Sequence, residues 1–254
     1  MWNDFAARIP ANHYQYAKGS VRNVVRKGFQ LELDISDYMQ WTLYFEVIVE
    51  PRQTLYALIK PEMHIMDIGA NIGETALHFS RITGESGLVY AFEPDPDTLK
   101  KLNKHIQVNN AKNIRVLNYA LGAESGVSFL GRNEFNSGGN SINGDQGTQI
   151  NIRTADEFVS ENTITRIDFI KIDVEGYEML ALKGAKNLIA SFKPVIFAEV
   201  VDEFLMNQGS SAAELLTFLK DSGYDLTDAY TGKRIEVADD FSNTHFDVIA
   251  TPAK

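Results

Sequence analysis

From residue 61 onward, short apolar runs alternate with longer stretches in which apolar residues recur every three or four positions. The first pattern predicts buried strands, and the second predicts amphipathic helices. Strands are predicted at residues 64–68, 88–92, 114–119, 169–173 and 195–200, and helices at 97–109, 155–160, 178–191 and 212–221, with one more helix burying Ala76, Leu77, Phe79 and Ile82. Strands separated by helices indicate right-handed crossovers and a mostly parallel sheet.

The last part of the chain departs from this alternation. Two further strands, at residues 224–230 and 246–251, follow one another without a helix between them and predict an antiparallel pair. The predicted fold class is therefore α/β, with a mostly parallel seven-stranded sheet that ends in an antiparallel C-terminal hairpin.

Residues 1–60 differ from the rest. Apolar and polar residues alternate between 21 and 35, which predicts a short strand pair. A run of aromatic and β-branched residues at 41–49, ended by Pro51, continues this strand-like pattern, and 53–60 is a candidate helix. We interpret 1–60 as a small β-rich cap on a main domain of residues 61–254. The cap could serve as a structural brace or as a substrate lid.

A Gly-, Asn- and Ser-rich segment at residues 131–148 predicts a long loop. Loops of this length in compact domains are usually functional or mobile. It could form a lid over an acceptor or a surface connection.

Composition narrows the classes of function. The chain has 254 residues, 44% of them hydrophobic, which is enough for a sizeable core. A net charge of -10 argues against charge-driven nucleic-acid binding, and the absence of cysteine excludes disulfides and thiolate chemistry. We find no signal-peptide pattern and no run of roughly 18 apolar residues. We therefore expect a cytoplasmic protein that neither inserts into membranes nor binds nucleic acid.

The segment Asp67-Ile-Gly-Ala-Asn-Ile-Gly73 ends the first strand of the main domain and opens a helix. Glycines permit a tight turn and a close approach to a ligand, and the helix start offers unpaired N–H groups. Asp67 would be unfavourable beside a pyrophosphate, but it suits the cationic aminoacyl end of S-adenosylmethionine. The spacing is G-x-x-x-G, which departs from the dinucleotide fingerprint. The alternative is an ordinary glycine turn.

Glu93 ends the second strand, and Pro94 follows it. An acid in this place can accept hydrogen bonds from both ribose hydroxyls. The alternative is an exposed acid that only complements the dipole of the next helix.

Four sequence blocks occur in a shared order: Asp67-Ile-Gly-Ala-Asn-Ile-Gly73, Ala91-Phe-Glu-Pro94, Asn118-Tyr-Ala-Leu-Gly122 and Asp168-Phe-Ile-Lys-Ile-Asp-Val-Glu-Gly-Tyr-Glu178. In order and spacing they resemble the FkbM-type methyltransferases over about residues 61–200, and Glu50-Pro51 resembles a Glu-Pro pair upstream of the family's cofactor loop. The resemblance implies a class I methyltransferase fold, which is Rossmann-like, and S-adenosylmethionine as cofactor, released as S-adenosylhomocysteine. It also implies O-methylation of a hydroxyl on a sugar or natural product.

The resemblance assigns residues to parts of the cofactor. Asp67, Gly69, Asn71 and Gly73 would surround the methionine end, Glu93 would bind the ribose, Asn118 and Ala120 would lie against adenine, and Glu50, Ala70 and Pro94 complete the predicted cofactor-binding set. Asp173 would end the fourth strand, facing the sulfonium and the acceptor. The acceptor is expected to be a small molecule or a glycan, and a homodimer is compatible with the sequence.

Methyl transfer to a hydroxyl is an in-line displacement that depends on positioning and on a base for the acceptor proton. The candidate bases are Asp173, Glu175 and Glu199, with His245 a more distant one. Glu175 could instead cap the next helix. Lys171, on a strand expected to be buried on both faces, could pair with an acid or extend to solvent. Glu199 and Asp173 lack a third ligand, so no metal site is predicted.

Two other functions are compatible with such a fold. One is a catalytically silent scaffold that retains the cofactor site, although Asp67, Glu93 and Asp173 are all present. The other is a nicotinamide-dependent oxidoreductase, which the departure from the dinucleotide fingerprint disfavours.

Overall fold

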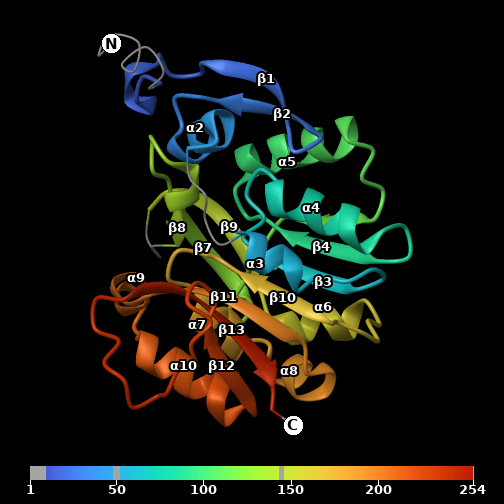
Figure 1. Cartoon of the computed structure of the whole chain (residues 1–254), viewed down its shortest axis with the longest axis vertical. Coiled ribbons are helices and arrows are strands. Elements are labelled where there is room, and N and C mark those ends of the chain that lie inside the picture. The colour runs from blue at the N-terminus through green and yellow to red at the C-terminus, as the bar shows by residue number, and fades with distance from the viewer. Residues whose placement is uncertain (1–9, 48–51, 143–145, 254) are drawn as a thin grey trace.

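The structure is a computed structural model that describes residues 10–47, 52–142 and 146–253. At its centre is a seven-stranded sheet in the order β12-β13-β11-β10-β3-β4-β5 (Figure 1). Its strands are β3 (His64–Ile68), β4 (Leu88–Phe92), β5 (Ile114–Leu117), β10 (Phe169–Ile172), β11 (Val195–Val201), β12 (Tyr224–Asp228) and β13 (His245–Pro252). The five strands from β5 to β11 are parallel, whereas β13 is antiparallel to both of its neighbours. This arrangement confirms the predicted fold class.

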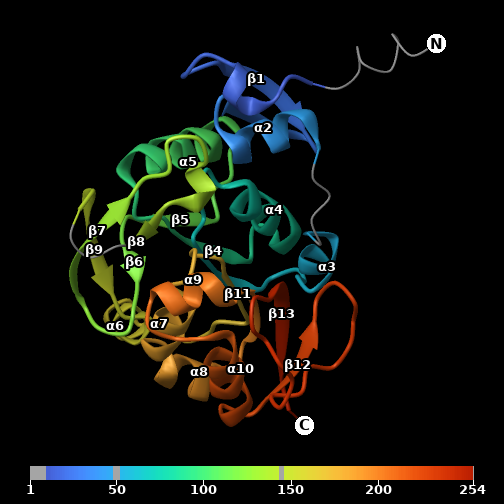
Figure 2. The same cartoon turned by 90° about the vertical axis from the view of Figure 1, so that its left-hand side faces the viewer.

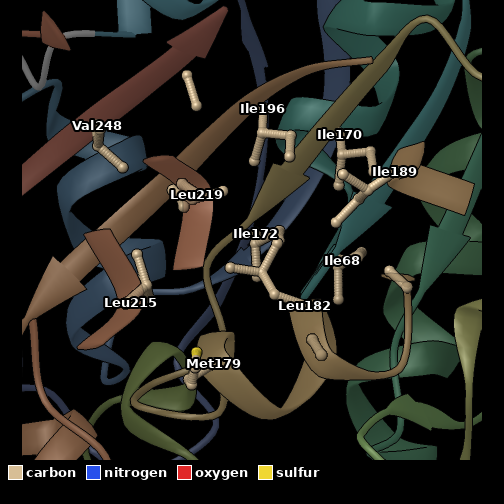
Figure 3. Packing of buried hydrophobic residues seen from close by; sticks show 14 of the residues in the cluster. Ile68, Ile170, Ile172, Met179, Leu182, Ile189, Ile196, Leu215, Leu219 and Val248 are labelled. Atoms are coloured by element: carbon tan, nitrogen blue, oxygen red, sulfur yellow. The ribbon is translucent and has the colours of Figure 1, made fainter. Parts of the chain in front are cut away.

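Helices cover both faces of this sheet (Figure 2). On one face lie α4 (Glu74–Thr83) and α5 (Pro96–Val108), and on the other lie α6 (Ala155–Glu161), α7 (Glu178–Lys183), α8 (Lys186–Phe192) and α10 (Ala212–Asp221). Figure 3 shows the second of these cores, in which Ile68, Ile170 and Ile172 pack against Leu182 and Leu215. Because successive strand residues point to opposite faces, the neighbours of these isoleucines point toward the α4 side.

The predicted N-terminal strand pair is present. β1 (Val21–Arg26) and β2 (Phe29–Asp34) form an antiparallel hairpin beyond the short helix η1 (His13–Gln15). The hairpin lies against α5 (Figure 1), where His105 accepts a hydrogen bond from the Glu32 N–H at 2.9 Å. The division of the chain into a cap and a main domain at residue 60 stays a prediction.

The strand-like interpretation of residues 41–49 is wrong for its described part. Residues 38–45 form the helix α2 (Tyr38–Phe45), which the Asp37 carboxylate caps by accepting a hydrogen bond from the Gln40 N–H. The aromatic residues of this segment serve helix packing instead of a strand face, since Trp41 is buried and stacks on Tyr38. The predicted helix at 53–60 is α3 (Arg52–Ala57).

The loop predicted at 131–148 is interrupted by short elements in its described part. The segment contains η2 (Ser137–Gly139) and β8 (Ser141–Ile142) and lies within a second, four-stranded sheet of order β6-β9-β7-β8. The other strands are β6 (Ala120–Leu121), β7 (Gly126–Gly131) and β9 (Thr148–Arg153). This sheet buries its own small core through Leu130, Ile142, Ile150 and Ile152. The third predicted strand accordingly ends at Leu117, and Ala120 belongs to the second sheet.

Two helices differ from the periodicity-based prediction. The single helix predicted at 178–191 is divided into α7 and α8 at Gly184, where a β-carbon would lie 2.0 Å from the Gly122 carbonyl oxygen. The chain therefore bends where two backbones meet closely. In addition, α9 (Asp202–Asn207) follows β11 directly, where no helix was predicted.

Candidate active site

A cavity of about 680 Å³ lies at the carboxyl ends of β3, β4, β10 and β11, which is where open α/β sheets bind ligands. Most of the predicted site residues line it: Gly69, Ala70, Asn71, Glu93, Pro94, Ala120, Asp173, Glu175 and Glu199. Three others lie outside its lining, namely Asp67, Gly73 and Asn118. Glu50 lies outside the described residues. The roles of all these residues in binding or catalysis stay predictions.

The loop after β3 comes close to the neighbouring backbone, as its glycines suggested. Gly69 has a φ of +78°, and a β-carbon there would lie 2.0 Å from the Asp173 carbonyl oxygen. Asn71 also has a positive φ, +48°, which asparagine tolerates better than most residues. Gly73 caps α4 behind the cavity, where a β-carbon would collide with Leu102. Only glycine therefore suits positions 69 and 73.

Glu93 joins the ends of β3 and β4. One carboxylate oxygen accepts a hydrogen bond from the Asn71 N–H at 2.9 Å, and the other accepts one from the Asp95 N–H at 2.8 Å. Burial raises the pKa of Glu93 to about 7. Asn118 donates hydrogen bonds to the Glu93 and Pro94 carbonyl oxygens, so it is tied to the end of β4 although it does not line the cavity.

Asp67 is fully buried and does not face the cavity. Its carboxylate accepts a hydrogen bond from the Thr75 hydroxyl of α4 and lies 3.4 Å from the Lys171 ammonium. Lys171 lies equally close to Asp173 and donates to the Gly69 carbonyl oxygen at 2.9 Å. Lys171 therefore pairs with a buried acid and a half-exposed acid and does not extend to solvent.

Three acids and a histidine gather on the wall formed by β10, β11 and β13. Glu199 lies 3.1 Å from His245, and both side chains line the cavity with Glu175 and Asp173. Burial, together with Glu199 and Asp173, raises the pKa of Glu175 to about 8. Burial and Asp173 also raise the pKa of Glu199. A raised pKa brings the exchange of a proton by a carboxyl group into the neutral pH range, in which general acids and bases work.

The opposite wall contains residues that were not predicted. Tyr38, Met39 and Leu43 of α2 line the cavity, as do Ser137 and Gly138. The signal that could have located α2 is the spacing Asp37-x-x-Gln40, which fits a helix N-cap followed by a glutamine three positions later. The Gly/Asn-rich stretch was singled out as a candidate lid, and the structure places it beside the cavity.

The polar groups that line the cavity are suited to bind S-adenosylmethionine. Among the described residues, the Asn71 Oδ1 atom is buried and has no hydrogen-bond partner, so it can accept from a ligand N–H. The close packing at Gly69 brings backbone to the cavity wall, and Glu93 offers further lone pairs on both oxygens. Within the described ranges, no three His, Asp or Glu side chains are grouped as metal ligands would be.

The strand order, the antiparallel β13 inside the sheet and the glycine loop followed by an acid on the next strand define a class I methyltransferase fold, whose methyl donor is S-adenosylmethionine. The family model described as "Methyltransferase FkbM domain" matches residues 67–226. The chain therefore belongs to the FkbM methyltransferase family.

Similar proteins carry methyltransferase names. The hexuronic acid methyltransferase AglP of Haloferax volcanii is 31% identical over 133 residues, which is 52% of this chain and 54% of that protein. The 2-O-methyltransferase NoeI of Sinorhizobium fredii is 25% identical over 173 residues, 61% of this chain and 70% of that protein. The chain thus matches about half the length of the first relative.

A solved FkbM methyltransferase from Methylobacillus flagellatus aligns with 98% of this chain and 57% of its own, at 17% identity and a TM-score of 0.47. Separately, the described helices include no candidate for a membrane span.

Proposed function

We propose that this protein transfers a methyl group from S-adenosylmethionine to a hydroxyl oxygen of a sugar or another small natural product. The observation that carries the proposal is the cavity at the strand ends, which joins the glycine loop and Glu93 on one side to a wall of carboxylates on the other. The names of the two relatives, one for a hexuronic acid and one for 2-O-methylation, support a glycan or sugar-like acceptor.

The cofactor supplies a methyl group on a sulfonium, which is already a good leaving group. The remaining work belongs to the chain: to hold the acceptor oxygen in line and to accept its proton. We assign the acceptance of this proton to Glu199, which lines the cavity and lies 3.1 Å from His245. Glu175 also lines the cavity, but its pKa of about 8 keeps it mostly protonated at neutral pH, so it can act as the base only at higher pH. Asp173 is held by Lys171, so we assign it to charge complementarity instead.

The first experiment is a calorimetric titration of the purified protein with S-adenosylmethionine, S-adenosylhomocysteine and NAD. We expect both S-adenosyl compounds to bind and NAD not to bind. Glu93→Ala should weaken S-adenosyl binding, whereas Glu85→Ala, which removes an exposed acid in the turn after α4, should not. A folded protein that binds neither S-adenosyl compound would contradict the proposal.

The second experiment separates an enzyme from a silent scaffold. Labelled S-adenosylmethionine is incubated with a panel of monosaccharides, methyl glycosides and polyhydroxylated aromatic compounds, and the products are analysed for O-methyl groups by NMR. Transfer to a hydroxyl supports the proposal. Cofactor binding without transfer to any member of the panel favours the scaffold, and transfer to an amine or a carboxyl contradicts the assignment of a hydroxyl acceptor.

A further inference from the structure

Lys171 lies at the centre of a buried ion triad that joins two strands. In the parallel pairing of β10 with β3, Lys171 is opposite Asp67, so their side chains leave the sheet on the same face. Asp173 lies two positions further along and leaves toward that face as well. The Lys171 ammonium is 3.4 Å from a carboxylate oxygen of each acid.

The ammonium of Lys171 is surrounded by acceptor oxygens of the protein. It has three N–H donors, and its three nearest acceptors are the Gly69 carbonyl oxygen at 2.9 Å and the two carboxylates at 3.4 Å. Burial alone would lower the pKa of Lys171, but Asp173 and Asp67 raise it. Because the side chain is charged and only 4% of the residue is exposed, Lys171 is a poor base.

The triad distributes its charge unequally. Burial raises the pKa of Asp67, and the Lys171 ammonium acts in the opposite direction. With both carboxylates ionised, the triad has a net charge of one negative unit. Asp67 is completely buried at one end, whereas 49% of the Asp173 side chain is exposed at the other, where it lines the cavity. Lys171 therefore neutralises the buried Asp67 carboxylate and holds one oxygen of Asp173. The remaining negative charge of the triad then lies on Asp173, at the cavity beside Gly69.

We propose that Lys171 is a positioning residue for the methionine end of S-adenosylmethionine, acting through Asp173. Lys171 holds the Asp173 carboxylate in the orientation that receives the cationic end of the cofactor, next to the glycine loop that the same ammonium fixes through Gly69. This inference rests on the proposed function, because it requires S-adenosyl compounds to bind in this cavity. In this proposal Asp173 interacts with the charge of the cofactor, whereas Glu175 and Glu199 are considered for the proton of the acceptor.

The test compares two ligands that differ at the methionine end. S-adenosylhomocysteine carries the amino-acid group, and 5′-methylthioadenosine lacks it. Calorimetry should show that Lys171→Met weakens S-adenosylhomocysteine binding at least about tenfold, as expected when one partner of a buried charge pair is removed. Binding of 5′-methylthioadenosine should change by less than about threefold, because residues outside the triad hold adenosine. General damage to the site would weaken both ligands alike.

A double-mutant cycle tests the route through Asp173. Asp173→Asn alone should weaken S-adenosylhomocysteine binding, and adding Lys171→Met should change it by less than about threefold further. Independent, additive losses would overturn the inference, since Lys171 would then act without Asp173.

Removal of Lys171 leaves Asp67 buried without its cation, which can prevent folding. The variant Asp67→Asn/Lys171→Met removes both buried charges and keeps Asp173, and its thermal melt checks that it folds. We expect it to bind S-adenosylhomocysteine as weakly as Lys171→Met does. Wild-type affinity in this variant would overturn the inference, because Lys171 would then only neutralise Asp67. Failure of the wild-type protein to bind S-adenosylhomocysteine would instead contradict the proposed function itself.

Discussion

At the scale of single residues, Glu175 shows how the chain creates an unusual acid. It follows β10 with a φ of +54°, a conformation that costs free energy for a residue other than glycine. This turn buries its carboxylate near those of Glu199 and Asp173. Burial, and to a smaller extent the repulsion from these two acids, raises the pKa of Glu175 to about 8. The folded protein therefore retains a proton on Glu175 in a pH range where the unfolded chain has released it.

A stability measurement can detect this proton. The pKa of a glutamate in an unfolded chain is about 4.3, so between that pH and about 8 the folded state binds more protons than the unfolded state, and stability falls as the pH rises. Glu175→Gln removes this dependence. We expect its Tm, relative to wild type, to increase by about 2 °C or more between pH 5 and pH 8.5 in calorimetric melts.

Glu203→Gln, which changes an exposed acid on α9, is the control and should keep a constant Tm difference from wild type over the same pH range. Parallel behaviour of the two variants would show that Glu175 is ionised in the folded protein throughout this range.

The sequence alone was sufficient to group Asp173, Glu175 and Glu199, because each lies at or just beyond the carboxyl end of a predicted strand. It could not decide the partners of Lys171. Those partners include Asp67 on β3, and contact between two strands so far apart in the chain depends on their order and register in the sheet. For the same reason, the sequence could not reveal that Asn118 donates to the Glu93 and Pro94 carbonyl oxygens, and its predicted contact with adenine stays a prediction.

At the scale of elements, α2 connects the N-terminal segment to the loop beside the cavity. One Asp37 oxygen caps the helix through the Gln40 N–H at 3.0 Å, and the other accepts a hydrogen bond from the Ser137 N–H at 2.5 Å. The Tyr38 N–H donates to the Phe135 carbonyl oxygen. The start of α2 thus holds residues 133–140 in place, and Met39 packs where Gly138 leaves room.

Two substitutions of Asp37 separate the helix cap from this loop contact. Asp37→Ala removes both and should destabilise the protein by about 1 kcal/mol through the lost cap, with faster proteolytic cleavage within 133–142. Asp37→Asn can still cap α2, but its amide has a single acceptor oxygen, so we expect near-normal stability with accelerated cleavage. Urea unfolding and timed proteolysis followed by mass spectrometry measure the two effects. Unchanged cleavage in Asp37→Asn would show that other contacts hold the loop.

The elements that were predicted correctly have a clear pattern of apolar residues. In those that were missed, one sequence feature favours a strand and another favours a helix. β10 is apolar at Phe169, Ile170 and Ile172, and such a run is typical of a strand buried on both faces. In α2, by contrast, aromatic residues that favour strands are helical because Asp37 caps them and Trp41 packs inward. β9 does alternate, with Ile150 and Ile152 buried, and this pattern could have revealed the second sheet.

At the scale of the whole molecule, His105 joins the hairpin to the glycine loop after β3. One ring nitrogen lies 2.8 Å from the Ile72 carbonyl oxygen, and the other accepts a hydrogen bond from the Glu32 N–H at 2.9 Å. A neutral ring with one donor and one acceptor satisfies both contacts. Burial lowers the pKa of His105 below its usual value of 6.5.

This histidine should make the molecule sensitive to acid. Below pH 6.5 the unfolded chain binds a proton that the folded protein excludes, so stability is lost as the pH falls. We expect His105→Gln to be less stable than wild type at pH 7.5 by about 1 kcal/mol, the contribution of a hydrogen bond. That difference should shrink by pH 5 in urea unfolding.

His245→Gln provides a control with the opposite sign. The hydrogen bond to Glu199 raises the pKa of His245, so its stabilisation is present at pH 5 and lost as the pH rises through the folded pKa. This variant should therefore lose most stability at pH 5. A His105→Gln deficit that grows on acidification would contradict the assignment of a neutral, buried ring.

The position of β13 has a consequence for biosynthesis. β11 and β12 leave the ribosome first, yet β13 must enter between them to complete the sheet. Until residues 245–252 emerge, β11 has one unpaired edge and β12 lacks the neighbour with which it pairs in this sheet. Exposed strand edges are templates for aggregation. The same strand delivers His245 and Asp247 to the cavity. A nascent chain that stalls before β13 therefore lacks part of the cavity wall and exposes the kind of unpaired strand edges from which chaperones protect folding chains.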